Sequence, residues 1–509
     1  MIPVYASADM RAMDAEAIAS GIPSLSLMDA AAAGLARALY RALGGVSGRS
    51  AVIFAGAGNN GGDGYALGSI LLAHKCAVRM IDTADGHAPT ADCAAMRRRF
   101  EAAGGKVSAF SPDCLRGADA AVDAMFGIGF RGKLSGTSAQ AAAAINAFSG
   151  FVLAADVPSG VYSDYGGMCE GAVCADATVC FSYPKGSCLL LPAAANCGQI
   201  LVEDIGVPAA IAEKYTPLFH MIDRGNLSVL ARRSRTAYKN QHGHALVIGG
   251  SARYAGAPYL AAAAAQRTGA GLVSCAVPSI LYNPIAAKLS SAMPCRLPDI
   301  EALGQDSLYE LLNLAAQSSA VLIGPGLGRA DATQTMVRDL LTMLNIPSVL
   351  DADGINALEG HIDILSGMPQ KPILTPHDGE FARLFGEKPP TEGRARMASA
   401  QAASKKCGCV LVLKGFRSIV CAPDGRTYVN PTGNPGLAKG GSGDILAGIT
   451  LSLLAQGLDP FDALCAAVWL HGAAGDGAAR RNGEYGMLPE DLLQELPLLL
   501  RTKDSMRYL

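Results

Sequence analysis

The chain has 509 residues and a formal net charge of −2; 50% of its residues are hydrophobic and 17% are charged. This length exceeds what one ordinary hydrophobic core encloses, so we expect two or three domains. The longest block of like charges is Arg97–Arg99, and such weak clustering argues against a protein that binds nucleic acid or an anionic membrane surface.

The first twenty residues and the cysteines predict a cytoplasmic protein. Met1–Ser20 contains Asp9, Arg11, Asp14 and Glu16 among its alanines, so it lacks the apolar core of a secretory signal. No stretch approaches the length of a membrane-spanning helix. The 14 cysteines follow no metal-binding rhythm, and scattered cysteines in a chain of this size are typical of reduced, buried thiols.

The first half of the chain alternates short strand-like runs with alanine-rich helical stretches. This alternation predicts an α/β domain with a mostly parallel sheet. The expected strands are Ala51–Ala55, Ala77–Ile81, Ala120–Asp123, Val152–Asp156 and Thr178–Phe181. The expected helices are Met10–Ser20, Ser26–Leu43, Gly64–Lys75, Thr90–Ala103 and Ser138–Phe148.

A glycine-rich loop follows the first of these strands and reads GAGNNGGDG over Gly56–Gly64. Gly56, Gly58 and Gly61 fit the G-x-G-x-x-G pattern of dinucleotide-binding folds, and Asp82 follows about 20 residues later. Alone, this pattern would indicate a nicotinamide dehydrogenase. The loop also carries two asparagines and an aspartate that the pattern does not require, and their oxygens suit a ligand or a cation.

Two aspartates end neighbouring strands further along the chain. Asp123 opens the stretch DAMFGIGFRG, and Asp156 opens DVPSG. Carboxylates at the carboxyl ends of parallel strands converge on the crevice in which such sheets bind ligands. Each aspartate could instead cap a following helix, but two of them beside the glycine loop favour a shared site.

Together, GNNGGDG, DAMFGIGFRG, DVPSG and TVCFSYPKG (Thr178–Gly186) resemble the NAD(P)H-hydrate epimerase family in order and spacing. The resemblance implies a Rossmann-like three-layer domain at residues 1–220. It also implies an enzyme that interconverts the R and S forms of hydrated NADH and NADPH at C6 of the nicotinamide ring. The sequence departs from the family pattern at Ile128, where threonine is usual, and at Leu27–Ala32, where LM-E-N-A-G is usual.

The same resemblance implies which residues form the site. Asn60, Asp123 and Ser159 would bind a potassium ion, and oxygen ligands of this kind suit a hard cation. Asp156 would be the catalytic acid or base, because a positioned carboxylate can carry the proton while the ring opens or dehydrates. The hydrated dinucleotide would contact Asn59, Asn60, Gly61, Gly62, Asp63, Gly127, Ile128, Gly129, Phe130, Arg131, Gly132, Lys133 and Asp156.

The joint between the two halves is expected within Tyr215–Gln241, which is polar and lacks periodicity. The second half, residues 226–500, shows the α/β alternation again without a sequence repeat. Its expected strands are Ala245–Ile248, Val273–Val277, Ala320–Ile323, Ser348–Leu350, Pro372–Leu374, Cys409–Leu413 and Ser418–Cys421. Its clearest helices are Pro258–Thr268, Ala332–Leu344, Thr391–Lys406, Gly443–Ala455 and Phe461–Arg480.

The strongest local signal in the chain is NPTGNPGLAKGGSGD at Asn430–Asp444. Gly440, Gly441 and Gly443 leave bare backbone amides at the start of a helix, where free N–H groups and the helix dipole bind phosphate. Asp444 could accept a proton from an attacking hydroxyl while these amides stabilise the phosphoryl oxygens. A glycine turn capped by an aspartate is the simpler alternative, but it would not require three glycines and a serine.

This pattern resembles the ribokinase-like superfamily, and other motifs select a branch of it. IGPGLG (Ile323–Gly328), LTPHDGE (Leu374–Glu380) and VLKG (Val412–Gly415), with HALVIGGS and GAGLV before them, are similar to the ADP-dependent NAD(P)H-hydrate dehydratases. The resemblance covers about Lys239–Leu496 and implies a ribokinase-like α/β domain. It departs from the family at Asn240, where the entry to the domain usually reads H-K-G.

By this resemblance Gly328, His377 and Asp444 contact the hydrated dinucleotide, and Asp444 is catalytic. ADP, together with Mg²⁺, would be bound by Lys414, Gly415, Phe416, Arg417, Ser418, Asn434, Gly440, Gly441, Ser442 and Gly443. The family phosphorylates the C6 hydroxyl of the S form, and loss of phosphate then restores the double bond. Phosphate is a far better leaving group than hydroxide, which explains why this reaction consumes a nucleotide.

Three other functions compete with this interpretation. A vitamin-type kinase of the same superfamily with an accessory N-terminal domain does not explain GNNGGDG and DVPSG. A binding or scaffold role for the first half is disfavoured by Asp123 and Asp156, and a dehydrogenase rests on the glycine pattern alone. The sequence leaves ATP open beside ADP, and the family resemblance alone predicts a homo-oligomer.

Overall fold

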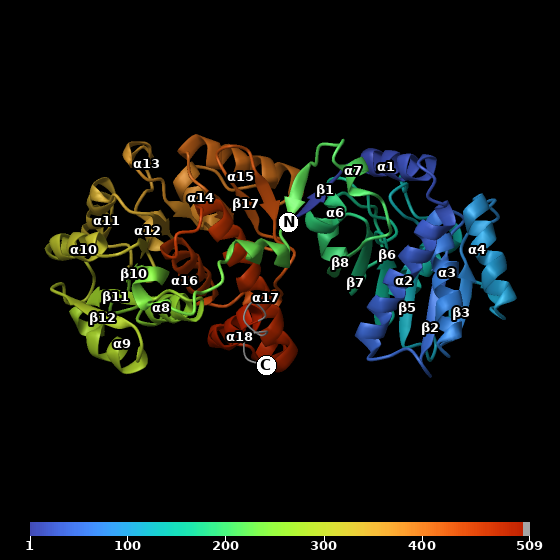
Figure 1. Cartoon of the computed structure of the whole chain (residues 1–509), viewed down its shortest axis with the longest axis horizontal. Helices are drawn as coiled ribbons and strands as arrows, with labels where there is room; N and C mark the ends of the chain where they lie inside the picture. Colours follow the sequence, from blue (N-terminus) through green and yellow to red (C-terminus); the bar gives the residue numbers. More distant parts are fainter. Residues whose placement is uncertain (502–509) are drawn as a thin grey trace. The chain divides into compact units, whose positions relative to one another are not determined.

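The structure, a computed structural model, describes residues 1–501 and divides into two compact units. The N-terminal unit consists of Ile2–Met221 with Thr391–Ala395. The C-terminal unit consists of Met1, Ile222–Pro390 and the chain from Arg396 onward. Each unit surrounds a mostly parallel sheet with helices (Figure 1), which confirms the predicted α/β class.

The N-terminal unit contains a seven-stranded sheet in the order β4-β3-β2-β5-β6-β7-β8, and all its neighbouring strands are parallel. A short antiparallel pair, β1 with β9, belongs to the same unit. Its elements are β1 (Ile2–Val4), α1 (Ser7–Ala19), α2 (Ser24–Leu43), β2 (Ser50–Ala55), α3 (Asn59–Ala73), β3 (Ala77–Asp82), α4 (Ala91–Ala102), β4 (Val107–Ala109), β5 (Ala120–Ala124), α5 (Gly136–Asn146), β6 (Phe151–Ala155), β7 (Ala177–Phe181), α6 (Gly186–Leu189), η1 (Ala193–Asn196), β8 (Gln199–Glu203), α7 (Ala209–Ala212) and β9 (Phe219–Met221).

Burial on both faces explains why the central strands of this sheet are almost entirely apolar. Every residue of β5 is buried, as are five of the six residues of β2, and continuous apolar runs are typical of parallel strands covered on both sides. Helices α2, α3 and α4 pack on one face of the sheet and α5 packs on the other. These layers bring the ends of β2, β5 and β6 to one edge, where the predicted site residues lie.

Helix α3 begins at Asn59, five residues before the predicted start at Gly64, so that prediction is wrong. The glycines of GNNGGDG were expected to form a loop, but here they permit close packing within a helix. A Cβ on Gly61 would lie 2.0 Å from the carbonyl oxygen of Gly56, and one on Gly64 would lie 2.8 Å from the Cβ of Ala124 in β5. The absence of side chains therefore lets the first turn of α3 rest directly on the sheet.

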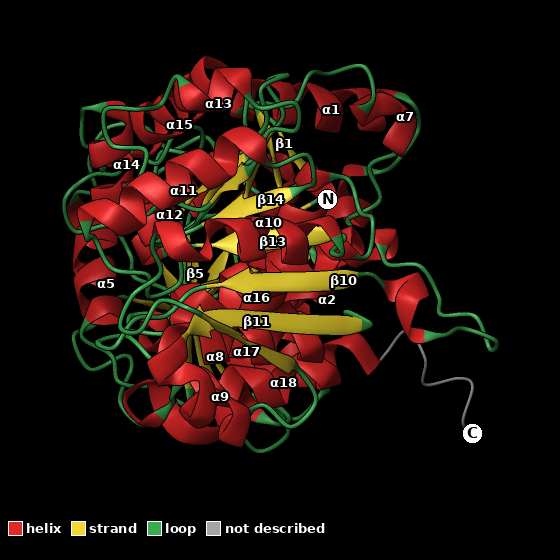
Figure 2. Ribbon diagram, turned by 90° about the vertical axis from the view of Figure 1, so that its left-hand side faces the viewer, coloured by secondary structure: helices red, strands yellow, loops and turns green. Residues whose placement is uncertain are grey.

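The C-terminal unit contains a sheet with strand order β18-β17-β16-β15-β14-β13-β10-β11-β12. Its strands are parallel except at β16–β17–β18, which pair antiparallel; Figure 2 shows β10, β11, β13 and β14. Its elements are η2 (Arg224–Val229), η3 (Lys239–His242), β10 (His244–Ile248), α8 (Gly256–Arg267), β11 (Leu272–Pro278), η4 (Ser279–Leu281), α9 (Tyr282–Lys288), β12 (Met293–Leu297), η5 (Gln305–Ser307), α10 (Leu308–Ala316), β13 (Ala320–Ile323), α11 (Asp331–Met343), β14 (Ser348–Leu350), α12 (Asp353–Asn356), α13 (Ile364–Gly367), β15 (Ile373–Leu374), α14 (Asp378–Phe385), α15 (Gly393–Cys407), β16 (Leu411–Leu413), β17 (Ile419–Cys421), β18 (Thr427–Val429), η6 (Pro435–Leu437), α16 (Ser442–Ala455), α17 (Pro460–Gly486) and α18 (Pro489–Arg501).

Helix α16 is the central helix of this unit. It is apolar and buried around almost its whole circumference and packs against α8, α17 and several strands. The crossing with α8 is so close that a Cβ on Gly448 would lie 2.1 Å from the carbonyl oxygen of Ala261. Since α16 is held rigidly by this core, its N-terminus presents Ser442, Gly443 and Asp444 in a fixed position.

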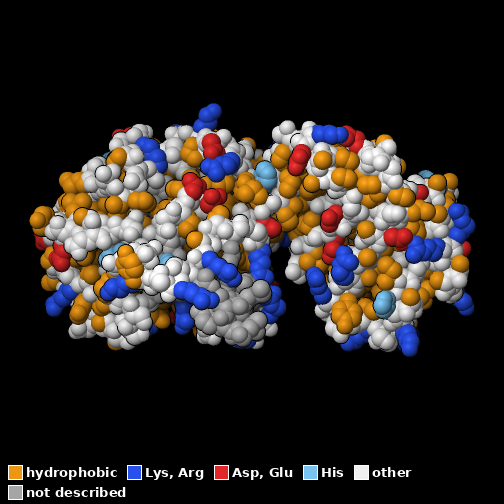
Figure 3. All heavy atoms as spheres, viewed as in Figure 1, with side chains coloured by type: hydrophobic (Ala, Val, Ile, Leu, Met, Phe, Trp, Pro, Cys, Tyr) orange, Lys and Arg blue, Asp and Glu red, His pale blue; other side chains and the backbone are white. Residues whose placement is uncertain are grey.

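The surface of the molecule carries mixed charges. On the face shown in Figure 3, basic and acidic side chains are interspersed among apolar and uncharged ones. Within residues 1–501, no helix is both long enough and apolar enough to cross a membrane.

We predict that Gly448→Ala destabilises the C-terminal unit by about 1–3 kcal/mol, because overpacking at the α8–α16 crossing forces the helices apart. Fluorescence of Trp469, the only tryptophan, reports on this unit during urea unfolding, since it lies in α17. Gly256→Ala is the matched control, because a Cβ there meets no atom within 4 Å. Equal urea concentrations at the midpoint of unfolding for Gly448→Ala and Gly256→Ala would contradict the prediction.

Candidate active sites

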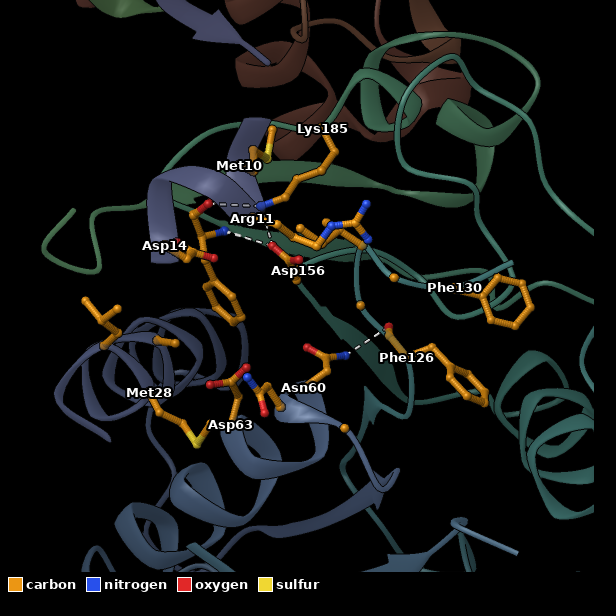
Figure 4. A pocket seen from close by; sticks show the side chains of 18 of the residues that line it. Met10, Arg11, Asp14, Met28, Asn60, Asp63, Phe126, Phe130, Asp156 and Lys185 are labelled. Carbon is orange, nitrogen blue, oxygen red and sulfur yellow. Dashed lines mark hydrogen bonds and ion pairs between the residues drawn. The ribbon is translucent and has the colours of Figure 1, made fainter. Parts of the chain in front are cut away.

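The N-terminal unit has a cavity of about 690 Å³ at the edge of the sheet where β5, β6 and β7 end. Helices α1 and α2 and the N-terminus of α3 form its other walls (Figure 4). The structure brings together ten of the predicted substrate residues as lining residues: Asn59, Asn60, Asp63, Gly127, Ile128, Gly129, Phe130, Arg131, Lys133 and Asp156. Gly61 and Gly62 are buried in the first turn of α3, and Gly132 lies in the loop after β5; these three are not among the residues that line the cavity.

Neither Asp123 nor Asp156 caps a helix, so the capping alternative is wrong for both residues. Asp123 lies within β5, and the helix after it, α5, begins beyond Ser135. Asp156 directly follows β6 with a positive φ of 67°, and the next element is β7. A positive φ is uncommon for a residue with a side chain and costs conformational energy. It turns the carboxylate of Asp156 into the cavity.

Lys185 forms a buried ion pair with Asp156. Its side chain is only 3% exposed, and its Nζ also donates to the carbonyl oxygen of Phe181 at 2.9 Å. Burial lowers the pKa of Lys185, but the charge and hydrogen bond of Asp156 together with the nearby Cys180 and Cys188 outweigh this effect, and the pKa is raised. Lys185 is therefore a fixed positive charge that holds the carboxylate of Asp156 in place.

Two further carboxyl groups, Asp14 of α1 and Asp63 of α3, line the same cavity. Burial and the charge of Asp156 raise the pKa of Asp63 well above its usual value. Burial also raises the pKa of Asp14, to about 6, although Lys185 partly opposes the shift. The cavity therefore contains carboxyl groups that differ in how readily they carry a proton.

Asp123, Ser159 and Asn60 form a buried cluster of oxygen atoms beside this cavity. Ser159 donates to Asp123 from both its hydroxyl (2.6 Å) and its backbone N–H (2.7 Å). Burial raises the pKa of Asp123 to about 6 even though these hydrogen bonds lower it. No basic side chain among residues 1–501 forms an ion pair with Asp123, whereas Lys185 does so with Asp156.

Asn60 supplies the other part of this cluster. Its Nδ2 donates to the carbonyl oxygen of Phe126 at 2.9 Å, while its Oδ1 is buried without a hydrogen-bond partner. An unsatisfied buried oxygen is costly, and Asn60 and Ser159 are both hydrogen-bonded to the backbone of Phe126, in the loop that follows Asp123. These donor atoms therefore fit a hard cation that prefers oxygen ligands.

The C-terminal unit has a cavity of about 650 Å³ in front of α16. Two of the predicted residues, Gly328 and Asp444, line this cavity. The other lining residues are Ser251, Arg253, Tyr254, Ala257, Ala302, Gly326, Leu327, Arg329, Ala330 and Asp353. Gly441 precedes α16 with a φ of 102°, where a Cβ would lie 2.7 Å from Leu260. Glycine is thus required at this turn both by its backbone conformation and by its packing.

Asp444 lies near a charged cluster at the ends of β14 and β16. Lys414 Nζ is 2.8 Å from Asp351 Oδ1 and 3.6 Å from Glu380 Oε2, and Thr375 also donates to Asp351 at 2.7 Å. Burial and then the charge of Asp351 raise the pKa of Asp444 to about 7, and Lys414 partly opposes this. Asp444 can therefore exchange a proton near neutral pH.

His377 is not among the residues that line this cavity; its side chain caps α14. Its Nδ1 accepts from the backbone N–H of Gly379 (2.9 Å) and Glu380 (3.3 Å), and its Nε2 lies 3.1 Å from the Glu380 carboxylate. The side chain is 53% exposed. Contact between His377 and substrate stays a prediction.

The predicted nucleotide-binding residues lie in three places. Gly440, Gly441, Ser442 and Gly443 form the turn into α16, and Lys414–Ser418 follow β16. A Cβ on Gly443 would lie 3.6 Å from Lys414 Nζ, so the two groups meet at the helix N-terminus. Asn434 instead caps η6 and donates to Asp476 at 3.0 Å.

Sequence reasoning missed Asp14, Lys185, Asp351 and Glu380. Asp351 directly follows a parallel strand, as Thr375 and the predicted Lys414 also do, so the rule that found Asp156 could have found it. Lys185 was also detectable, because it is the only charged residue between Thr178 and Leu191. No comparable signal marks Asp14, which is one of several charges on α1.

Two known families match the chain. The NAD(P)H-hydrate dehydratase family matches residues 245–498, and the YjeF-related protein N-terminus matches residues 24–187. The chain is 37% identical over 496 residues to the bifunctional NAD(P)H-hydrate repair enzyme of Moorella thermoacetica, which covers 95% of this chain and 94% of that protein. It is 34% identical over 519 residues to the corresponding enzyme of Salinibacter ruber, covering 97% and 95%. Among solved structures, a ribokinase-like superfamily protein from Enterococcus faecalis is similar with a TM-score of 0.50 and 29% identity, covering 57% of this chain and 98% of that chain.

We predict that Lys185→Met destabilises the N-terminal unit by about 3–5 kcal/mol, because it leaves Asp156 buried without a counter-charge. Amide hydrogen exchange in peptides from β6 and β7 measures this loss. Lys214→Met is the matched control, since Lys214 pairs with Glu16 at the surface, with its side chain 60% exposed, and such exposed pairs contribute little to stability. Similar protection of these amides from exchange in Lys185→Met and Lys214→Met would show that the buried ion pair does not stabilise the N-terminal unit.

Proposed function

The chain belongs to the family of bifunctional NAD(P)H-hydrate repair enzymes, and from this membership we propose how its two units divide the repair. The N-terminal unit interconverts the R and S forms of hydrated NADH and NADPH. The C-terminal unit dehydrates the S form to NAD(P)H and converts ADP to AMP and phosphate. The single observation that carries the assignment of dehydration to the C-terminal unit is the position of Asp444. It lies at the N-terminus of α16 and lines one cavity with Gly328.

In the dehydration, Asp444 accepts the proton of the C6 hydroxyl as this oxygen attacks the terminal phosphate of the nucleotide. The backbone amides at Gly441–Gly443 and the positive end of the α16 dipole stabilise the negative charge on the phosphoryl oxygens. Lys414 adds positive charge at the same position, since its Nζ lies beside Gly443. Gly328 and His377 are assigned to the substrate, and Lys414–Ser418, Asn434 and Gly440–Gly443 to the nucleotide. Mg²⁺ would accompany the nucleotide and balance its charge.

In the epimerisation, Asp156 acts on the proton of the C6 hydroxyl, and Lys185 keeps Asp156 oriented into the cavity. Asn59–Asp63 and Gly127–Lys133 surround the dinucleotide from two sides. Asn60, Asp123 and Ser159 would hold potassium, which supplies a positive charge next to the substrate when it is bound. The unsatisfied Oδ1 of Asn60 and the unpaired charge of Asp123 support this assignment.

We further propose that the enzyme acts in the cytoplasm on these small molecules. The 14 free cysteines support a reducing compartment. The homo-oligomer remains an expectation from the family.

The proposal is tested with a purified mixture of R- and S-NADH hydrate, incubated with ADP, with ATP or without nucleotide. Complete recovery of NADH absorbance with ADP is expected, because epimerisation feeds the R form into the dehydration. Recovery that stops at the S fraction would contradict epimerisation by the N-terminal unit. No recovery with either nucleotide, together with a stable phosphorylated product from another alcohol, would favour a small-molecule kinase.

We predict that the rate of dehydration rises with pH through about 7, because Asp444 must be ionised to accept a proton and its pKa is raised to about 7. Asp444→Asn should lower kcat by about 10²–10⁴-fold and remove this pH dependence. Steady-state assays with pure S-NADH hydrate and ADP measure both effects. Epimerisation by the same variant is the internal control and should persist. A rate within twofold of the unsubstituted chain would assign the base elsewhere.

A further inference from the structure

Asp14 is a carboxyl group that faces the N-terminal cavity without a fixed partner. It lies on α1, next to the wall that carries Asp156 and Lys185 (Figure 4). Within residues 1–501, its carboxylate forms neither a hydrogen bond nor an ion pair, whereas Asp156 is paired with Lys185. A half-buried carboxyl group that stabilises nothing around it is unusual and suggests a role towards a ligand.

Asp14, Asp63 and Asp156 share a single buried cation, Lys185. The other charged residues that line the cavity are Arg11, Asp92, Arg131 and Lys133, and both arginines are exposed. Arg131 donates to the carbonyl oxygen of Phe130 at 2.7 Å, and Lys185 is engaged by Asp156. Of these three carboxyl groups, only Asp156 is paired with the buried lysine, and burial raises the pKa of the other two.

Epimerisation by ring opening requires two groups, one that removes a proton and one that supplies it. The C6 carbon bears both the hydroxyl and the bond to the ring nitrogen N1. Opening the ring removes the hydroxyl proton and leaves N1 in need of a proton. Two carboxyl groups, one protonated and the other ionised, can make both transfers in the same step, each from its own side of C6.

Building on the proposed epimerase function, we infer that Asp14 is its second acid/base residue, which donates a proton to N1 while Asp156 accepts the proton of the C6 hydroxyl.

The step balances without any co-reactant. The O–H electron pair becomes the C6=O double bond, the C6–N1 bond breaks, and its electron pair takes the proton of Asp14. Rotation about the C5–C6 bond turns the other face of the aldehyde towards N1. N1 then attacks C6, Asp14 takes back the N1 proton, and Asp156 returns its proton to the oxygen.

Asp14 fits this role better than Asp63. Asp63 is buried in α3, and burial raises its pKa well above the usual value, so it holds its proton more firmly than Asp14 does. The pKa of Asp14 is raised only to about 6, and an acid of this strength both gives and regains a proton near neutral pH.

The test follows conversion of R- to S-NADH hydrate by the full chain without nucleotide, using chromatography and subtracting the spontaneous rate. Asp14→Asn should lower kcat by about 10²–10⁴-fold with little change in KM. In the unsubstituted chain the rate should fall as pH rises above about 6, because Asp14 must carry its proton; this fall should be absent in the variant. Formate should partly restore the rate of Asp14→Ala by taking the place of the missing carboxyl group.

Asp9→Asn is the matched control, since Asp9 lies on the same helix but does not line the cavity. Epimerase activity of Asp14→Asn within twofold of the unsubstituted chain would overturn the inference. Loss of the pH dependence in Asp63→Asn rather than in Asp14→Asn would also overturn it. Reduced activity with an unchanged pH profile and no rescue by formate would mean that Asp14 is only structural. Absence of epimerisation by the unsubstituted chain would overturn the proposed function itself, which distinguishes that failure from the others.

Discussion

A lysine ammonium among carboxylates lies at the centre of each of the two sites. In the N-terminal unit it is Lys185, paired with Asp156; in the C-terminal unit it is Lys414, between Asp351 and Glu380. Removing such charges from water costs several kcal/mol per ion, and only close pairing repays that cost. The carboxyl ends of parallel strands make this pairing possible, because they hold the partners at fixed distances along one edge of the sheet.

The pairing also determines which carboxyl groups remain able to exchange protons. Burial and the charge of Asp351 raise the pKa of Asp444 to about 7, and Lys414, which pairs with Asp351 and Glu380, offsets only part of this. Burial likewise raises the pKa values of Asp14 and Asp63, and Lys185, which pairs with Asp156, offsets only part of each shift. In each unit, the lysine pairs with some carboxyl groups and leaves others able to carry a proton.

Sequence patterns predicted the features that depend on local rules. The apolar runs placed the central strands to within one or two residues, and these strands in turn placed Asp123 and Asp156 at one edge. The glycines before Asp444 correctly predicted a helix N-terminus at that position. The predicted start of α3 was wrong because glycine normally disfavours helical structure. Glycine is required here because a side chain on Gly61 would meet the backbone of Gly56 and one on Gly64 would meet Ala124 in β5. The second of these contacts is between segments that are far apart in the chain.

The partners of the acidic residues could be predicted from the sequence only where they directly follow a parallel strand. Asp351, Thr375 and Lys414 follow strands as directly as Asp156 does, so the same reasoning extends to them. Asp14 differs, because a carboxylate on a surface helix most often faces solvent, and only the packing of α1 beside the ends of β6 and β7 turns it towards the cavity. What makes Asp14 a candidate acid is thus its burial in a cavity whose lysine is already paired with Asp156. That arrangement exists only once three separate segments have folded together.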